Sequence, residues 1–290
     1  MFLRPRFNQP SQSHYDGGFA PQESPPMFQN ARPVIPVLDL MIGQIVLATE
    51  GNRDSYQPVH SRLTHSSQPI DVAKAIFNQT ECNCLYLADI DSFAGAKLSW
   101  SVYNSLLNSG FGLLIDANWM ADRRIDRIAD EIEKPEKLNI ILSSETLATS
   151  DQFACFEDLI SNHIEPIFSL DVKGESIITQ KGELSDRTPL ELVRMAFDRG
   201  VRNMIVLDLD SVGTMSGYTN QEISIGPIIQ EIKSELPDVR LISGGGVKEP
   251  KDVQALLDLG CKHALVASAI HDGKFTPDDI AGFEAFQKMA

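Results

Sequence analysis

The sequence predicts a parallel (β/α)8 barrel, and three observations lead to this fold class. Eight short apolar runs rich in β-branched residues alternate with amphipathic stretches between residues 33 and 290. The runs are apolar almost throughout, as expected of strands buried on both faces of a parallel sheet. Segments in the two halves of this region also resemble one another, in the same order. Eight strand–helix units in about 250 residues match the size of such a barrel.

The chain before this region has a different composition. Residues 1–32 are rich in Pro, Gln, Ser, Asn and Gly and show no apolar periodicity. A segment of this kind buries too little apolar surface to offset the entropy that it loses on ordering. We therefore expect a disordered extension over 1–32, which could also serve as a docking tail, followed by one domain over 33–290.

The expected strands and helices follow one another along the domain. The strands cover 34–40, 84–90, 111–116, 138–143, 165–172, 203–209, 239–243 and 263–268. Helical patterns cover 69–79, 98–110, 189–200, 225–236 and 250–260. Several of these patterns end in glycine, a common helix stop. A doubly wound sheet is the alternative fold, but it does not require eight units, and no GxGxxG motif follows the first strand.

The internal resemblance predicts two half-barrels of four units each. The similar pairs of segments are 88–95 with 207–214, 37–40 with 169–172, and 141–144 with 265–268. Their members are 119, 132 and 124 residues apart, respectively. Each short match could arise by chance among apolar strands, so the shared order of the three carries the argument.

The composition excludes several classes of function. Lys and Arg number 25 against 40 Asp and Glu, which gives a net charge of −15 and a pI of about 4.8. Nucleic acids and anionic lipids are bound by basic surfaces, so this balance argues against both as partners. No apolar run approaches the roughly 18 residues that span a bilayer, and the N-terminus lacks a signal-peptide pattern. We expect a cytoplasmic protein.

The cysteines and histidines predict neither a disulfide framework nor a metal site. The four cysteines form no CxxC pair, and neither they nor the six histidines show the spacing of zinc ligands. We expect reduced, buried thiols and no bound metal.

Three aspartates are candidates for catalysis, because active sites of barrel enzymes lie at the carboxyl ends of the strands. Asp39 ends the first expected strand, and Asp171 ends the fifth, on the opposite side of the ring. Two carboxyl groups placed in this way can divide the work, one accepting a proton while the other donates one. Asp208, at the end of the sixth strand, is the third candidate. A structural role, such as capping a loop, is the alternative for each.

A phosphate site is expected after the last two strands. Ser243, Gly244, Gly245 and Gly246 close the seventh strand, and Ala267 and Ser268 close the eighth. Glycine lets backbone amides approach an anion closely, and a phosphate site in these two loops recurs in barrel enzymes. A plain tight turn is the alternative interpretation of the glycine run.

Six segments together resemble the HisA/HisF barrels of histidine biosynthesis. The segments are 35–46, 85–95, 169–177, 212–217, 243–253 and 266–275. This family contains ProFAR isomerase, which performs an Amadori rearrangement, and the cyclase subunit of imidazole glycerol phosphate synthase. The resemblance spans nearly all of 33–275 and is closer to the isomerase. It implies a two-fold half-barrel plan and chemistry that uses no metal or organic cofactor.

The resemblance also assigns roles to individual residues. Asp39 matches the catalytic aspartate of the first strand, and Asp171 matches the aspartate of the fifth. The resemblance implies that Asp39 acts as a general acid or base in ring opening and enolisation. The phosphate contacts implied after strands seven and eight are Ser243, Gly244, Gly245, Ala267 and Ser268.

Two departures from the family pattern bear on the substrate. The isomerases carry a second catalytic aspartate before a Gly-Thr pair after strand six, where this chain has Val212, which cannot transfer a proton. The family's second phosphate site, after strand three, is replaced by a segment that begins with Asp116, whose charge would repel a phosphate. Ser143 and Ser144, at the end of strand four, retain hydroxyl groups and would form only a weakened second site.

The sequence therefore predicts a divergent member of this group that acts on a phosphorylated small molecule, with one phosphate bound. Sugar-phosphate isomerisation or a related enolisation is the leading hypothesis, with Asp39 and Asp171 as the acid–base pair. An authentic ProFAR isomerase is the second hypothesis. The third is a barrel that binds a phosphorylated ligand or a partner protein without catalysis, for which the biosynthesis of a one-carbon cofactor is a plausible setting. The sequence leaves the identity of any protein partner open.

Overall fold

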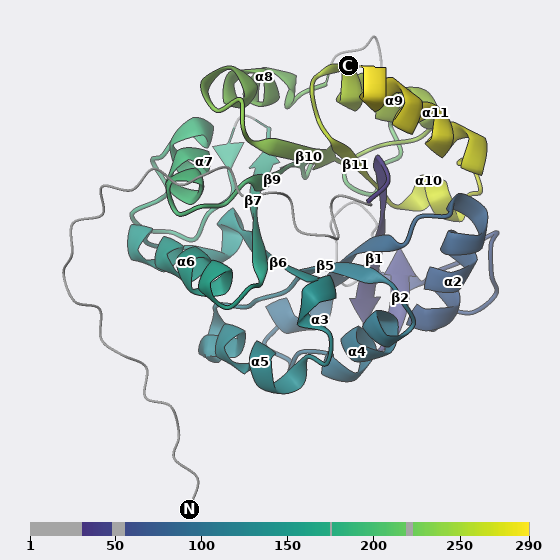
Figure 1. Cartoon of the computed structure of the whole chain (residues 1–290), viewed down its shortest axis with the longest axis horizontal. Coiled ribbons are helices and arrows are strands. Elements are labelled where there is room, and N and C mark those ends of the chain that lie inside the picture. Colours follow the sequence, from purple (N-terminus) through teal and green to yellow (C-terminus); the bar gives the residue numbers. More distant parts are fainter. Residues whose placement is uncertain (1–30, 48–55, 175, 219–222, 290) are drawn as a thin grey trace, which may run out of the picture.

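Eight parallel strands form a closed ring in the computed structural model, which describes residues 31–47, 56–174, 176–218 and 223–289. The strands are β1 (Val34–Met41), β4 (Cys84–Asp89), β5 (Gly112–Asp116), β6 (Leu138–Ser143), β7 (Glu165–Lys173), β9 (Asn203–Asp208), β10 (Arg240–Gly244) and β11 (His263–Val266). Pairing of β11 with β1 closes the ring (Figure 1). The predicted barrel is thereby confirmed, and the doubly wound alternative is wrong because an open sheet would lack this pairing.

Helices surround the ring (Figure 1). Five coincide with predicted helical patterns: α2 (Pro69–Thr80), α4 (Trp100–Asn108), α7 (Pro189–Asp198), α8 (Gly226–Glu235) and α9 (Pro250–Asp258). Gly110, Gly200 and Gly260 follow α4, α7 and α9 with φ values of 101°, 91° and 94°, the left-handed conformation that ends a helix.

Other helices were not among the predicted patterns. They are α3 (Ile90–Phe93), α5 (Ile128–Glu131), α6 (Ala154–Ser161), α10 (Ser268–His271) and α11 (Pro277–Met289). Short 3-10 turns cover Ala121–Arg127, Pro135–Lys137, Ser144–Thr146 and Ser150–Phe153. Most of these elements are about one turn long, too short for an apolar period to stand out in the sequence.

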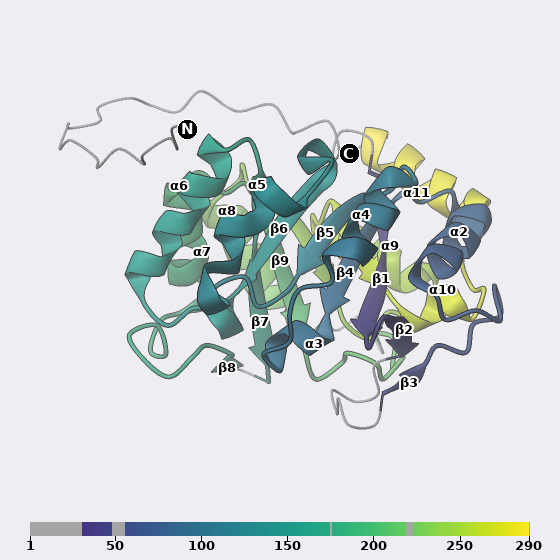
Figure 2. The same cartoon turned by 90° about the horizontal axis from the view of Figure 1, so that it is seen from below.

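Short antiparallel strands extend β1 and β7 at one end of the barrel. β2 (Gln44–Leu47) pairs with β1 and with β3 (Gln57–Pro58), while β8 (Ser176–Ile177) pairs with β7. Figure 2 shows β2, β3 and β8 at the end of the barrel to which the strands β1 and β7 point. These additions therefore border the mouth formed by the carboxyl ends of the strands.

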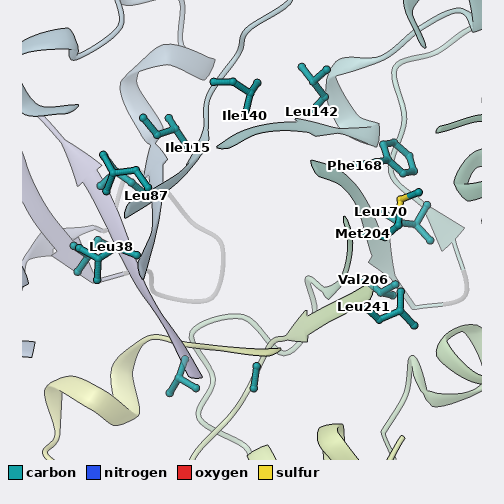
Figure 3. Close-up of a cluster of buried hydrophobic side chains, with 14 of the residues drawn as sticks. Leu38, Leu87, Ile115, Ile140, Leu142, Phe168, Leu170, Met204, Val206 and Leu241 are labelled. Carbon is teal, nitrogen blue, oxygen red and sulfur yellow. The ribbon is translucent and has the colours of Figure 1, made fainter. Parts of the chain in front are cut away.

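Alternate side chains of each strand pack into two separate layers. The outward-facing layer packs against the helices, and ten of its residues are labelled in Figure 3, among them Leu38, Leu87, Phe168 and Val206. The inward-facing layer fills the ring with Ile35, Cys84, Tyr86, Ala88, Leu114, Ile141, Ile167, Ile205, Ile242 and Leu265. This burial on both faces explains why the strands are apolar at nearly every position.

A polar layer lies at the amino-terminal end of the strands. Glu165 Oε1 lies 3.0 Å from Arg240 Nη2 and accepts a hydrogen bond of 2.5 Å from Asn203 Nδ2. His263 Nδ1 lies 2.9 Å from the carbonyl oxygen of Arg32, just before β1. Burial raises the pKa of Glu165 to about 7 despite the attraction of Arg240. These contacts close the end of the barrel opposite to the mouth.

The expected N-terminal extension lies largely outside the described residues. Of the range 1–32, only Ala31 and Arg32 are described, and both contact the barrel. Arg32 forms ion pairs with Glu81 at 2.6 Å and with Glu284 at 3.4 Å. The folded unit thus includes the two residues before the expected boundary at residue 33.

The two halves of the barrel repeat one contact. Asp91 Oδ2 accepts a hydrogen bond of 2.6 Å from the backbone N–H of Ile42, at the turn between β1 and β2. Asp210 Oδ2 accepts one of 2.7 Å from the N–H of Gly174, at the turn between β7 and β8. Ile42 and Gly174 are 132 residues apart, as Asp39 is from Asp171. This repeated tether supports the predicted half-barrel organisation.

Candidate active site

A pocket opens at the carboxyl ends of the strands. Its walls include Asp39 of β1, Tyr86 of β4, Gly245 and Gly246 after β10, and Ser268 at the start of α10. The complete lining among the described residues also contains Val37, Val46, Leu47, Ala88, Leu207, Val212, Gly213, Met215, Val247, Leu265, Ala267 and His271. Asp39 and both predicted phosphate-binding segments therefore share one opening.

Asp39 reaches this pocket because it faces into the ring. Ile35 belongs to the inward-facing layer, and the alternation of a strand places Asp39, four positions later, on the same side. Its strand neighbour is Ala88 of β4, whose small side chain leaves room beside the carboxyl group. A carboxylate in this position can exchange a proton with a molecule bound in the pocket.

Asp171 lies on β7 and is not among the described residues that line the pocket. Its side chain is 5 % exposed, and Oδ1 accepts a hydrogen bond of 2.9 Å from Ser169 Oγ. Burial, together with the negative charges of Asp116 and Glu145, raises the pKa of Asp171 well above its ordinary value. Asp171 therefore retains its proton at a pH at which an exposed aspartate has lost it.

Tyr86 lies in the electrostatic field of these carboxyl groups, and the sequence did not single it out. Its hydroxyl donates a hydrogen bond of 2.5 Å to Asp116 Oδ2. Burial, followed by the charges of Asp116, Asp171 and Asp39, raises the pKa of Tyr86 well above its ordinary value. The phenol thus lies in the field of all three carboxyl groups and stays protonated. Its inward position follows from alternation with Cys84, so the parity of the strand could have revealed it.

Asp208 is placed differently from Asp39 and Asp171. Its carboxylate accepts hydrogen bonds from Ser211 Oγ at 2.7 Å, Ser224 Oγ at 2.5 Å and the N–H of Asp210 at 3.1 Å. It shares the outward-facing side of β9 with Val206, which Figure 3 shows pointing away from the ring. These contacts favour a role in holding the loop after β9, so catalysis by Asp208 stays a prediction without geometric support.

The glycine run fits tightly between neighbouring strands and loops. A Cβ atom on Gly244 would lie 2.7 Å from Leu265 Cβ, and one on Gly245 would lie 2.5 Å from the carbonyl oxygen of Asp208. Gly245 and Gly246 also have φ values of 107° and 74°, in the region that favours glycine. Packing alone thus requires glycine here, and the same geometry exposes peptide groups to the pocket.

The other members of the predicted phosphate site contribute in different ways. Ser243 is buried, and its hydroxyl donates a hydrogen bond of 2.8 Å to the carbonyl oxygen of Val206, so it stabilises strand packing. Ala267 and Ser268 line the pocket directly. Any contact of Ser243 with a ligand would therefore have to come from its backbone.

In the described structure, the predicted weakened second phosphate site offers no exposed hydroxyl group to a ligand. Ser144 Oγ donates a hydrogen bond of 2.7 Å to the carbonyl oxygen of Ile178 and accepts one of 3.1 Å from the N–H of Asp171. Ser143 is 1 % exposed. Because these hydroxyl groups are buried or already bonded within the protein, they offer little to a phosphate.

His271 is a further pocket residue that sequence reasoning missed. Burial lowers the pKa of this imidazole to about 4, so it is neutral at physiological pH. Nδ1 lies 3.3 Å from Ser61 Oγ. A neutral imidazole can donate or accept one hydrogen bond with a ligand. Only its position three residues after Ser268 could have pointed to it.

Two broader features concern metals and membranes. Among the described residues, no group of three or more His, Cys, Asp and Glu side chains is arranged to hold a metal ion. No described helix combines the length and apolar character needed to cross a membrane.

Comparison with known proteins identifies the family. The family model described as "Histidine biosynthesis protein" matches residues 33–276. An uncharacterized protein of Methanocaldococcus jannaschii is 26% identical over 252 residues, covering 85% of this chain and 96% of that protein. A 1-(5-phosphoribosyl)-5-((5-phosphoribosylamino)methylideneamino)imidazole-4-carboxamide isomerase of Halobacterium salinarum is 25% identical over 257 residues, covering 85% and 94%. An isomerase of the same name from Flavobacterium johnsoniae is 25% identical over 250 residues, covering 84% and 95%. Because the family model matches most of the chain and the fold is the expected barrel, the protein belongs to the histidine biosynthesis family of HisA/HisF-like barrels.

Proposed function

We propose that this protein is an isomerase-type enzyme that performs acid–base chemistry on a sugar phosphate or related small molecule carrying one phosphate. The observation that carries this proposal is the shared pocket, which is lined by Asp39 together with Gly245, Gly246 and Ser268. A phosphate held by the glycine loop would place the rest of the molecule beside the carboxyl group of Asp39. The family of the chain supports an isomerase-like reaction, while its departures from that family bear on the substrate.

The two carboxyl groups suit different steps. Asp171, with its raised pKa, donates a proton to the ring oxygen of the sugar as the bond from that oxygen to C1 breaks. Asp39, as carboxylate, removes the proton from C2, and the electron pair of that C–H bond forms the C1–C2 double bond of an enol. Asp39 then returns this proton to C1, while the C2 hydroxyl gives its proton to Asp171 and becomes a carbonyl group, so that both carboxyl groups end in their starting states. Tyr86 lies in the field of both groups, and its hydroxyl is bonded to Asp116.

The side of the mouth near β5 and β6 supports a substrate with one phosphate rather than two. Asp116 has its carboxylate bonded to Tyr86, and the Ser144 hydroxyl is bonded within the protein. A phosphate dianion brought to Asp116 would meet negative charge in a buried setting, where repulsion is strong. The opposite side of the mouth carries the glycine loop.

Substitution of Asp39 tests the proposed chemistry. Asp39→Asn should reduce kcat on a turned-over sugar phosphate by at least about a hundredfold, the usual contribution of a general acid or base. The affinity for inorganic phosphate should change little, because that ion binds at the glycine loop. Turnover that is unchanged in Asp39→Asn would remove this residue from the mechanism and would favour a barrel that binds a ligand without catalysis.

An authentic ProFAR isomerase is the second candidate, and the names of similar proteins from Halobacterium salinarum and Flavobacterium johnsoniae favour it. Against it stand Val212, where the isomerases carry an aspartate, and Asp116 at the second phosphate position. Expression of this chain in a histidine auxotroph that lacks the isomerase separates the candidates. Growth without histidine would contradict the proposal of a substrate with one phosphate.

A further inference from the structure

The loop after β9 lies behind the glycine loop and holds its carbonyl groups. Tyr218 Oη donates a hydrogen bond of 3.1 Å to the carbonyl oxygen of Gly245. The N–H of Gly217 donates one of 2.9 Å to the carbonyl oxygen of Gly246. Two successive carbonyl groups of the glycine loop are thus fixed by two successive residues of another loop.

These bonds determine where the following N–H groups point. In a trans peptide the C=O and N–H bonds point in opposite directions. With the carbonyl of Gly245 directed at Tyr218, the N–H of Gly246 points away from Tyr218, and the N–H of Val247 points away from Gly217 in the same manner. Gly245, Gly246 and Val247 line the pocket, whereas Tyr218 is not part of the lining formed by the described residues. The two N–H groups are therefore directed toward the pocket side.

The loop that carries Tyr218 is itself anchored by a buried carboxylate. Asp252 of α9 is 1 % exposed, and its Oδ1 accepts a hydrogen bond of 3.0 Å from the N–H of Tyr218. Its Oδ2 accepts bonds of 2.9 and 3.0 Å from the N–H groups of Lys248 and Glu249, which follow the glycine loop. Asp252 thus joins the two loops on the side away from the pocket.

Tyr218 is suited to act as a permanent donor. Burial raises the pKa of its hydroxyl well above the ordinary value, so the phenol is neutral over the whole physiological range. A phenolate could only accept a hydrogen bond and would release the Gly245 carbonyl.

We propose that Tyr218 is a positioning residue for the phosphate site: its hydroxyl, anchored through Asp252, orients the Gly245–Gly246 peptide so that adjacent N–H groups face a bound phosphate. The inference rests on the proposed function, because it assumes that the glycine loop binds the phosphate of the substrate. Preorganised donors bind an anion more tightly, since less conformational entropy is lost on binding. The phosphate site would accordingly be built from the β9 loop as well as from the loops after β10 and β11.

Calorimetry with inorganic phosphate tests the inference on the full chain. Tyr218→Phe retains the ring and removes only the hydroxyl group, and it should raise the Kd roughly threefold to tenfold, the effect of one hydrogen bond. Tyr103→Phe is the matched control, because the buried Tyr103 hydroxyl donates to Asp89 on the outward side of β4. The control should lose stability but keep the wild-type Kd. Asp252→Asn provides a second variant and should also raise the Kd, because it replaces one of the two carboxylate oxygens that anchor the loops.

Amide NMR gives a readout that a general loss of stability would not move. Saturating phosphate should shift the amide proton signals of Gly246 and Val247 downfield in the wild-type protein and in Tyr103→Phe, and much less in Tyr218→Phe. Equal Kd values for wild type and Tyr218→Phe, or an equal loss in the Tyr103→Phe control, would overturn the inference alone. Wild-type protein that shows no saturable phosphate binding would overturn the proposed function, and the inference with it.

Discussion

At the residue scale, the protonation of Asp171 makes the stability of the fold depend on pH. Burial and the neighbouring charges of Asp116 and Glu145 raise its pKa in the folded state, whereas unfolding returns it to water, where aspartate has a pKa of about 3.9. Between these two values the folded state binds more protons than the unfolded state, so stability falls as the pH rises. The contribution is complete below about pH 4 and is lost as the pH rises through the folded pKa.

Asp171→Asn should therefore change the pH dependence of stability. Asn cannot ionise, so the variant should equal wild type to within about 1 kcal/mol near pH 4 and exceed it at neutral and higher pH. Urea unfolding at a series of pH values measures the difference. Parallel curves for the two proteins would show that Asp171 does not titrate with folding.

The sequence could predict those site residues whose strand position and chemistry agree. Asp39 follows an apolar run, and its side chain lines the pocket at the mouth, as expected. Asp208 also follows an apolar run, but it comes one position after the inward-facing Leu207, so its side chain lies on the outward side of β9 and bonds to Ser211 and Ser224. Tyr86 and His271 stand within apolar or turn segments that carry no chemical signature of their own. Their roles depend on neighbours from other strands, which a single sequence does not reveal.

At the element scale, the turn between β1 and β2 contains a strained residue. Met41 pairs with Gln44, so Ile42 and Gly43 form a two-residue hairpin loop with φ values of 50° and 70°. Such turns favour Asn-Gly, whereas a β-branched residue in the left-handed region costs about 1–2 kcal/mol. The hydrogen bond from the Ile42 N–H to Asp91 helps to hold this conformation.

Ile42→Asn should stabilise the protein by about 1 kcal/mol, because it relieves that strain. Little apolar burial is lost, since Ile42 is 81% exposed. Thermal and urea unfolding measure the gain. Gly43→Ala at the neighbouring position is the control and should destabilise, since nothing lies within 4 Å of the added Cβ and only the positive φ opposes it. A loss of stability in Ile42→Asn would show that the isoleucine side chain makes a contribution that its exposure does not indicate.

The strands were predictable from the sequence and the hairpins were not, for one physical reason. Each barrel strand buries both faces, which leaves a continuous apolar run in the sequence. β2 and β8 are four and two residues long, and the turns that pair them with β1 and β7 are tethered by Asp91 and Asp210 from other units. The half-barrel repeat of those aspartates was visible in the sequence, but the partners of their carboxylates were not.

At the scale of the whole molecule, the two halves share an architecture but differ in the chemistry that they bring to the mouth. The loops after β10 and β11 supply glycine peptides and the start of α10. The corresponding ends of β5 and β6 supply Asp116, bonded to Tyr86, and buried serines. Because the tethers of both halves are intact, this difference concerns ligand binding rather than folding. The proposed phosphate site would therefore lie beside Asp39, in the pocket that both share.

This asymmetry predicts how the whole protein discriminates between ligands. Ribose 5-phosphate should raise the thermal unfolding midpoint more than ribulose 1,5-bisphosphate at equal concentration, since a ligand stabilises the folded state by RT ln(1 + [L]/Kd) and the tighter ligand gives the larger shift. Asp116→Asn removes the charge but keeps an oxygen that can accept the Tyr86 hydroxyl. The ratio of the two Kd values should then move by roughly tenfold in favour of the bisphosphate, about 1.4 kcal/mol. Asp210→Asn changes the net charge equally at a site tethered to Gly174, so it should leave the ratio unchanged. A wild-type protein that prefers the bisphosphate, or an equal response to both substitutions, would show that the charge of Asp116 does not select the substrate.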